Sequence, residues 1–365
     1  MALKCGLVGL PNVGKSMLFN GLSNGNAASA NFPFCTIAPN LGVVAVPDPR
    51  IELLDTYADA KNSIPAGIAF VDIAGLVKDA HKGEGLGNKF LAHIREVDAI
   101  VHVIRCFEDE DVLHVAGSVD PVFDKQIIDY ELRCKDIDSL TKRLHKMEHL
   151  AKHAPKVPQS TYELLNRFLT ALKQGRNARD IQVAAADQPL VDDWQLLTSK
   201  PVIYFANVDE ATMLGKQNVH LAALQAAIAE ENGEVIIGST ALEIQLNALN
   251  GDERNFFLEA YKLTGSTLDK LIQSAYSLLQ LITYFTVGPQ EVRAWTIQNG
   301  IKAPQAAGVI HTDFQRGFIK AEVIAFEDYK TYKSVQGCRE AGKLRIEGKD
   351  YIVQDGDIMF FRFNV

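Results

Sequence analysis

The stretch GLPNVGKS, from Gly9 to Ser16, constrains the fold of this 365-residue chain more than any other. An apolar run at 4–8 precedes it and predicts a short buried strand, and the segment 16–22 predicts a helix. Strand, glycine-rich loop and helix form the context that the phosphate-binding pattern GxxxxGK[ST] requires. The glycines let several N–H groups point at a phosphate, and the helix N-terminus adds a positive dipole. We therefore predict a nucleotide-phosphate site that includes Asn12, Val13, Gly14, Lys15, Ser16 and Met17.

A nucleotide that carries Mg²⁺ needs oxygen ligands besides the hydroxyl of Ser16. The non-helical stretch NFPFCTIAPN at 31–40 supplies Thr36 as a candidate. The apolar run GIAFVDIAGL at 67–76 predicts a buried strand that ends in Asp72, with Gly75 completing a DxxG pattern. We expect Ser16, Thr36 and Asp72 to hold Mg²⁺, and the N–H of Gly75 to contact the γ-phosphate.

These motifs, together with DIAGLVKDAHKGEGLGNKFL from residue 72 and NVDE from residue 207, resemble the Obg-like subgroup of translation-factor-class P-loop GTPases. The whole chain is similar to the YchF subfamily, the Obg-like ATPases. The resemblance implies an α/β fold, with a Ras-like P-loop NTPase domain built on a mostly parallel sheet, an inserted helical coiled-coil hairpin and a C-terminal β-grasp TGS domain. It also implies ATP as substrate and the ribosome or another RNA-containing partner.

The base-reading motif departs from the NKxD pattern of ordinary GTPases. In NKxD the Asp accepts a bidentate pair of hydrogen bonds from guanine. Here Val208 replaces the Lys and Glu210 replaces the Asp, which removes that discrimination and favours ATP over GTP. Asn207 still offers hydrogen bonds to a purine edge. In the alternative reading a loop shift brings Asp209 into the Asp role and keeps GTP, and 239–243 is a weaker match to the last base-contacting loop.

The group that positions the attacking water is not the usual one. Ras-type proteins place a Gln directly after DxxG, and this chain has Leu76 there, which cannot bind water. His81, His93 and His114 are the candidates to replace it. We favour His114, because it follows an acidic loop at a strand end, where active sites lie in doubly wound sheets. Lys15 and His114 are thus the expected catalytic residues, and a plain surface role for His114 is the alternative.

A helical arm is predicted in the middle of the chain, because apolar residues from position 137 onward recur at 3–4 spacing. Pro155 and Pro158 end the first helix, and Ser160 with Glu163 forms a capping box that predicts a second one. NVDE follows this arm, so we expect nucleotide-binding segments at 1–128 and 199–280 and an inserted arm at 129–198. The spaced apolar positions are Ile137, Leu140, Leu144, Met147 and Ala151.

The arm is locally basic within an acidic chain. Residues 131–180 contain 11 Lys and Arg against 6 Asp and Glu, whereas the whole chain has a formal charge of −8. Such a surface could follow a phosphate backbone, and a solvated helical arm is the equally weighted alternative. The candidate partner-binding residues are Arg133, Lys135, Lys142, Arg143 and Lys146.

The segment 281–365 changes to short strands and turns. The runs 283–287, 292–297, 321–325, 343–346 and 358–363 predict strands, and 311–318 predicts a short helix. This segment holds 11 basic and 10 acidic residues, so charge gives no independent sign of RNA binding. The TGS assignment and its RNA-linked role therefore come from the resemblance alone.

Composition narrows the class of protein further. No apolar run reaches the roughly 18 residues of a membrane helix, no signal-peptide pattern opens the chain, and its five cysteines are scattered. We therefore expect a cytoplasmic protein with no membrane partner. The leading hypothesis is a slow, Mg-dependent ATPase switch. Its rival is a GTP-dependent nucleic-acid-binding protein with little turnover. No acceptor-binding lid is evident, so we expect no small-molecule acceptor.

Overall fold

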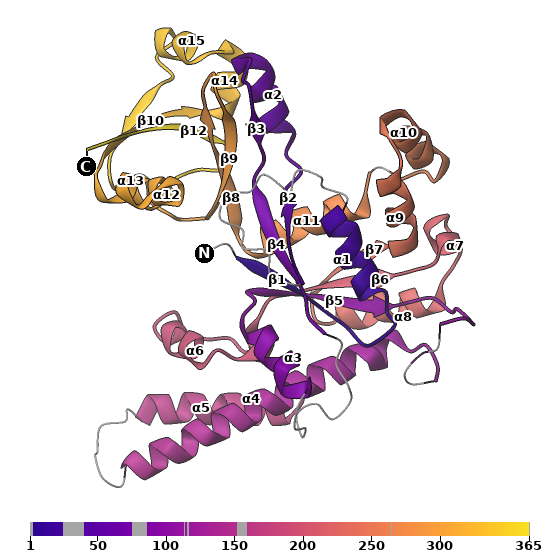
Figure 1. Cartoon of the computed structure of the whole chain (residues 1–365). Coiled ribbons are helices and arrows are strands. Elements are labelled where there is room, and N and C mark those ends of the chain that lie inside the picture. Colours follow the sequence, from indigo (N-terminus) through magenta and orange to yellow (C-terminus); the bar gives the residue numbers. More distant parts are fainter. Residues whose placement is uncertain are drawn as a thin grey trace.

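Two β-sheets organise the chain in the computed structural model (Figure 1). The structure describes residues 3–24, 40–74, 86–112, 114, 117–151, 159–263 and 265–364, and within these ranges each sheet has six strands. None of the helices described there is long and apolar enough to cross a membrane.

The first sheet has the strand order β2-β4-β1-β5-β6-β7. Five of its strands are parallel, and β2 alone runs antiparallel, to β4. This confirms the predicted α/β fold with a mostly parallel sheet. The carboxyl ends of parallel strands share one edge, so the phosphate loop, Asp72 and the NVDE loop meet there. The strands are β1 (Lys4–Val8), β2 (Leu41–Ala45), β4 (Gly67–Asp72), β5 (Ala99–Arg105), β6 (Val202–Asn207) and β7 (Glu234–Gly238).

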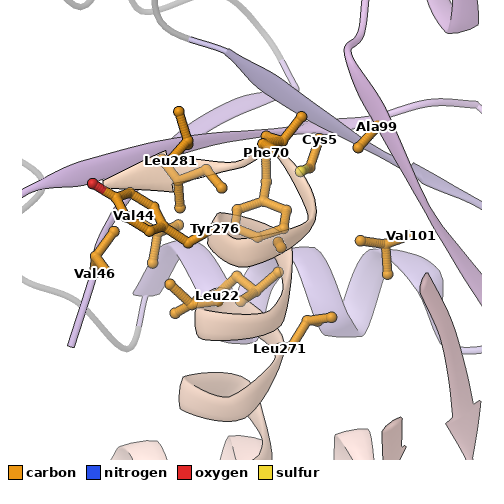
Figure 2. Close-up of a cluster of buried hydrophobic side chains, with 14 of the residues drawn as sticks. Cys5, Leu22, Val44, Val46, Phe70, Ala99, Val101, Leu271, Tyr276 and Leu281 are labelled. Atoms are coloured by element: carbon orange, nitrogen blue, oxygen red, sulfur yellow. The ribbon is translucent and has the colours of Figure 1, made fainter. Parts of the chain in front are cut away.

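Helices cover this sheet and bury its apolar side chains. Figure 2 shows Phe70 of β4 in one buried cluster with Leu22 of α1 and Tyr276 of α11. Phe70 is fully buried, and burying a side chain of this size stabilises the fold by about 2–3 kcal/mol. This packing fixes the helix that follows the phosphate loop against the sheet. The helices of this part of the chain are α1 (Lys15–Asn24), α2 (Pro49–Ala58), α3 (Leu86–Arg95), α7 (Glu210–Met213), α8 (Val219–Ala229), α9 (Thr240–Ala248), α10 (Gly251–Ala260) and α11 (Thr267–Leu278). Of these, α2 packs on the second sheet and α10 packs on α9.

The arm consists of α4 (Pro121–Ala151) and α5 (Gln159–Lys173), which lie side by side (Figure 1). A separate core holds them together, and Phe168 packs edge-on against Trp194 with ring centroids 5.3 Å apart. The helix α4 crosses the boundary that the sequence suggested at 128/129. Because α5 begins at Gln159, Ser160 lies inside its first turn instead of preceding it. The arm also includes η3 (Ala178–Asp180), α6 (Gln188–Trp194) and η4 (Leu197–Ser199).

The second sheet contains the strands expected after residue 280, in the order β11-β10-β12-β8-β9-β3. The strand β3 (Ser63–Ile64) belongs to the N-terminal part of the chain and pairs in parallel with β9. Arg50 of α2 reinforces this junction, with its Nη1 2.6 Å from Asp355 Oδ2. The N-terminal part of the chain is therefore joined to the second sheet by main-chain pairing as well as by side chains. The elements are β8 (Leu281–Val287), β9 (Val292–Gln298), α12 (Ala303–Ile310), α13 (Thr312–Arg316), β10 (Phe318–Ala325), α14 (Phe326–Tyr332), α15 (Val335–Glu340), β11 (Arg345–Glu347) and β12 (Asp357–Phe363).

Candidate nucleotide site

The phosphate loop joins β1 to α1 and has the backbone that its sequence predicts. Asn12 and Gly14 adopt positive φ values of 65° and 92°. A Cβ on Gly14 would also collide with the side-chain amide of Asn207, so only glycine fits at this position. The helix α1 begins at Lys15, and its first N–H groups face the loop. The loop therefore has the backbone that a phosphate-binding cradle requires.

Three polar side chains meet at the end of this cradle. The Nζ of Lys15 forms an ion pair with Oδ1 of Asp72, and the hydroxyl of Ser16 lies 3.3 Å from the other carboxylate oxygen. Lys15 is only 7% exposed. A hydroxyl and a carboxylate this close suit a small, hard cation such as Mg²⁺, which prefers oxygen ligands. The other two residues predicted to act here, Thr36 and Gly75, lie outside the described residues.

A cavity of about 740 Å³ extends from the phosphate loop, which is within the usual range for a small-molecule site. It is lined by Asn12, Gly14, Lys15, Ser16 and Met17 at one end and by Asn207, Val208, Asp209 and Glu210 at the other. Val13 is not among the described lining residues, because its side chain is buried. Two further groups line the cavity. Ser239–Leu242 with Gln245, around α9, include the segment that the sequence indicated as a weaker match to the last base-contacting loop, whereas Phe107, Glu108, Asp109 and Val112, after β5, were not indicated as lining residues.

Asn207 is buried between two loops of the site. Its Nδ2 donates to the carbonyl of Val13 at 2.9 Å, and its Oδ1 accepts from the N–H of Thr240 at 3.1 Å. Val208 is also buried, and its N–H donates to the carbonyl of Gly238 at 2.9 Å. Asn207 therefore ties the phosphate loop to the start of α9. This structural role was not predicted, and it leaves the second hydrogen of Nδ2 for a purine.

The two acidic residues of NVDE have different partners. Asp209 is the N-cap of α7, because its Oδ1 accepts from the N–H of Thr212 at 3.0 Å and also from the Thr212 hydroxyl. These bonds, the hydroxyl's above all, lower the pKa of Asp209 below its ordinary value. Glu210 accepts a hydrogen bond from the hydroxyl of Tyr261 at 2.5 Å. Both carboxylates are thus engaged within the protein.

His114 follows the lining residue Val112 by two positions but is not among the described residues that line the cavity. Its Nε2 is 2.9 Å from Oδ2 of Asp124 in the first turn of α4, and both side chains are buried. Burial raises the pKa of Asp124, and the bond to His114 opposes that shift. Of the other candidates, His93 is exposed on α3, while His81 and Leu76 lie outside the described residues.

The five basic residues predicted for partner binding differ in their surroundings. Lys142 and Lys146 are exposed on α4. Lys142 is paired with Asp138 at 2.8 Å, and Lys135 lies 4.0 Å from the same carboxylate. Arg143 binds Asp193 at 3.3 Å, whereas Arg133 donates to Asn177 inside the arm. Of these five residues, Lys142 and Lys146, in the outer part of α4, are therefore the ones that present their cations to solvent.

Comparisons with known proteins fit this geometry. The family model "50S ribosome-binding GTPase" matches residues 4–143, and the YchF GTPase C-terminal model, described as a protein of unknown function (DUF933), matches residues 281–364. Ribosome-binding ATPase YchF of Bacillus subtilis is 49% identical over the full length of both chains. Obg-like ATPase 1 of Gallus gallus is 46% identical over 100% of this chain and 93% of its own. The solved structure of the Schizosaccharomyces pombe YchF GTPase has a TM-score of 0.90 at 37% identity, and covers 99% of this chain and 97% of that one.

The parallel sheet, the phosphate loop between β1 and α1, and Asp72 at the end of β4 define a P-loop NTPase of the GTPase class. The sequence identity of 46–49% to full-length relatives assigns the chain to a particular family within this class. The chain belongs to the YchF family.

Proposed function

We propose that this protein is a Mg²⁺-dependent ATPase that binds GTP less well, hydrolyses its nucleotide slowly, and couples the nucleotide state to binding of the ribosome. One observation carries the proposal: Lys15, Ser16 and Asp72 converge at one end of a cavity whose other end is formed by the altered base motif. The full-length relatives named ribosome-binding ATPase support both the reaction and the partner.

The phosphate end would work through charge. Lys15 is paired with Asp72 in the structure, and an incoming β,γ-phosphate would take over the ammonium group. Asp72 would then be released to hold Mg²⁺ together with Ser16, and Thr36 would complete the ligands. The bound cation would neutralise negative charge on the phosphates. His114 would orient the attacking water in place of the missing Gln.

The base end would favour adenine. Adenine presents an acceptor at N1, where a carboxylate aimed at a guanine edge would repel it. Asp209 is committed to capping α7 and Glu210 to Tyr261, so neither is placed as a free guanine acceptor. The amide of Asn207 and backbone groups near Val208 would read the purine instead, beside the aromatic ring of Phe107.

The partner surface would combine two parts of the chain. The exposed cations of α4, Lys142 and Lys146, would contact ribosomal RNA. The C-terminal segment, which we assign to the TGS class by resemblance, would supply the second contact. Such a protein would act in the cytoplasm, where ribosomes are found. The presence or loss of the γ-phosphate would alter the affinity for the partner.

The test is phosphate release from ATP with and without ribosomes, in the wild type and in Lys15→Ala. We expect slow release that ribosomes increase and that Lys15→Ala abolishes.

A second candidate is a GTP-dependent nucleic-acid-binding protein with little turnover. It is favoured by the engagement of His114 with Asp124 outside the cavity lining. Tight nucleotide-dependent ribosome binding without any release of phosphate would support it and refute the ATPase.

A further inference from the structure

A buried histidine–carboxylate pair lies beneath the loop that follows β5. His114 and Asp124 have side chains that are 5% and 2% exposed, and their bond is 2.9 Å long. The other oxygen of Asp124, Oδ1, is buried with no hydrogen-bond partner among the described residues. A carboxylate is expensive to bury, so a pairing that leaves one oxygen unsatisfied calls for a reason beyond packing.

The pair is not needed to hold the loop in place, because another residue does so. Arg105 at the end of β5 is 1% exposed, and its guanidinium donates to the carbonyls of Phe107, Val112 and Asp109 at 2.9, 2.8 and 3.3 Å. These three bonds fix the loop that lines the cavity. The bond between His114 and Asp124 therefore adds a constraint on the imidazole itself.

The carboxylate is held on a firm base. Lys125 directly follows Asp124 in the chain. Its Nζ lies 2.8 Å from Asp129 and 2.6 Å from Glu231, which precedes β7. Arg179 of η3 approaches the same Asp129 at 3.4 Å. This charge network, buried apart from the exposed Glu231, anchors the first turns of α4 on the sheet. A group used for positioning needs such support from its surroundings.

We propose that Asp124 is the positioning residue for His114: it accepts a hydrogen bond from Nε2–H and thereby fixes the ring tautomer and the ring orientation. This inference rests on the proposed role of His114 in hydrolysis. A carboxylate behind an imidazole performs this task in other hydrolytic sites, where its isosteric amide is a poor substitute because it no longer selects one tautomer.

The kinetic test is a double-mutant cycle on the full chain with ATP, using Asp124→Asn, His114→Ala and the combination. We expect Asp124→Asn to lower kcat by roughly 10- to 100-fold with KM for ATP unchanged. Adding it to His114→Ala should have no further effect, because residues that act as a unit are not additive. Asp120→Asn is the matched control: Asp120 is exposed at the start of α4, accepts from the N–H of Phe123 at 3.0 Å, and an Asn can replace it there. Its kcat should stay at the wild-type value.

A wild-type kcat in Asp124→Asn, or a further drop in the double variant, would overturn the proposal. Thermal unfolding of each variant identifies any loss that is due to misfolding. The ring tautomer gives a readout that does not need turnover: ¹⁵N NMR should show His114 protonated at Nε2 in the wild type and a mixture in Asp124→Asn. A wild type protonated at Nδ1 alone would refute the positioning role. Failure of the ATPase itself would appear instead as no phosphate release in the wild type, with the tautomer as expected.

Discussion

The side-chain amide of Asn207 binds the carbonyl of Val13 at 2.9 Å, which joins the base-reading loop to the phosphate loop across 194 positions of sequence. The same side chain accepts from the N–H of Thr240. Three loops of the site, those after β1, β6 and β7, thus depend on one residue. A change at either the base end or the phosphate end of the cavity would be transmitted to the other.

Replacing Asn207 with Ala should weaken binding of every nucleotide and also destabilise the fold. The substitution leaves two buried backbone groups, the Val13 carbonyl and the Thr240 N–H, without partners, which costs about 1–3 kcal/mol. Denaturant unfolding gives the stability change, and titration with ATP and GTP gives the affinities. We expect both affinities to fall. An unchanged stability would contradict the bridging role, whereas a loss confined to ATP would restrict Asn207 to reading adenine.

Replacing Asp209 with Ala should destabilise α7 without changing the preference for ATP over GTP. The N-cap is lost, so the free energy of unfolding should drop by about 1 kcal/mol, while Asp209→Asn should keep most of it because Asn is an equally good cap. The measurements are denaturant unfolding and the ATP-to-GTP affinity ratio. If both variants lose GTP binding selectively, Asp209 reads guanine and the alternative reading of the motif is correct.

His102 makes the stability depend on pH. Burial lowers its pKa to about 4, against the opposing effect of Asp129. The folded protein therefore holds His102 neutral. The contribution of this neutral histidine to the free energy of unfolding is full above its ordinary pKa near 6.5, and it is lost as the pH falls toward 4. The loss amounts to about 3 kcal/mol over that window.

A His102→Phe variant should lose this part of the pH dependence, as measured by urea unfolding between pH 7.5 and 4. His93→Gln is the control, because His93 is exposed on α3. The same slope in wild type and His102→Phe would mean that other groups produce it.

The exposed cations of the arm should contribute to RNA binding by charge alone. Lys142→Ala and Lys146→Ala should each weaken binding to ribosomal RNA and reduce the slope of log affinity against log salt by about one. Binding is measured from 50 to 200 mM salt. Lys262 is an exposed cation just after α10, and Lys262→Ala should leave the slope unchanged. If the wild type and all three variants show the same salt dependence, the arm is a solvated surface that does not bind RNA.

Local sequence patterns were enough to predict most of the fold and the phosphate end of the site. The glycine pattern, the apolar strands and Asp72 all act through short-range geometry, and the strands at 4–8 and 67–72 have the predicted bounds. The start of α4 was missed although its signal is present: Asp120 and Pro121 form a typical helix N-terminus.

The base end depends on relationships that no local pattern contains. The order β1-β5-β6-β7 brings Phe107, after β5, beside the NVDE loop after β6, and that order is a property of the whole sheet. The bond from Tyr261 to Glu210 joins separate helices. Likewise β3 is only two residues long, so nothing in its sequence predicts that it pairs with β9.

Base preference is the central claim, and competitive binding of ATP and GTP measures it most directly. The wild type should bind ATP at least about tenfold more tightly than GTP, because no free carboxylate is placed for guanine. The double variant Val208→Lys, Glu210→Asp restores the NKxD chemistry and should shift the ratio toward GTP. A wild type that already prefers GTP strongly would contradict this account of the site.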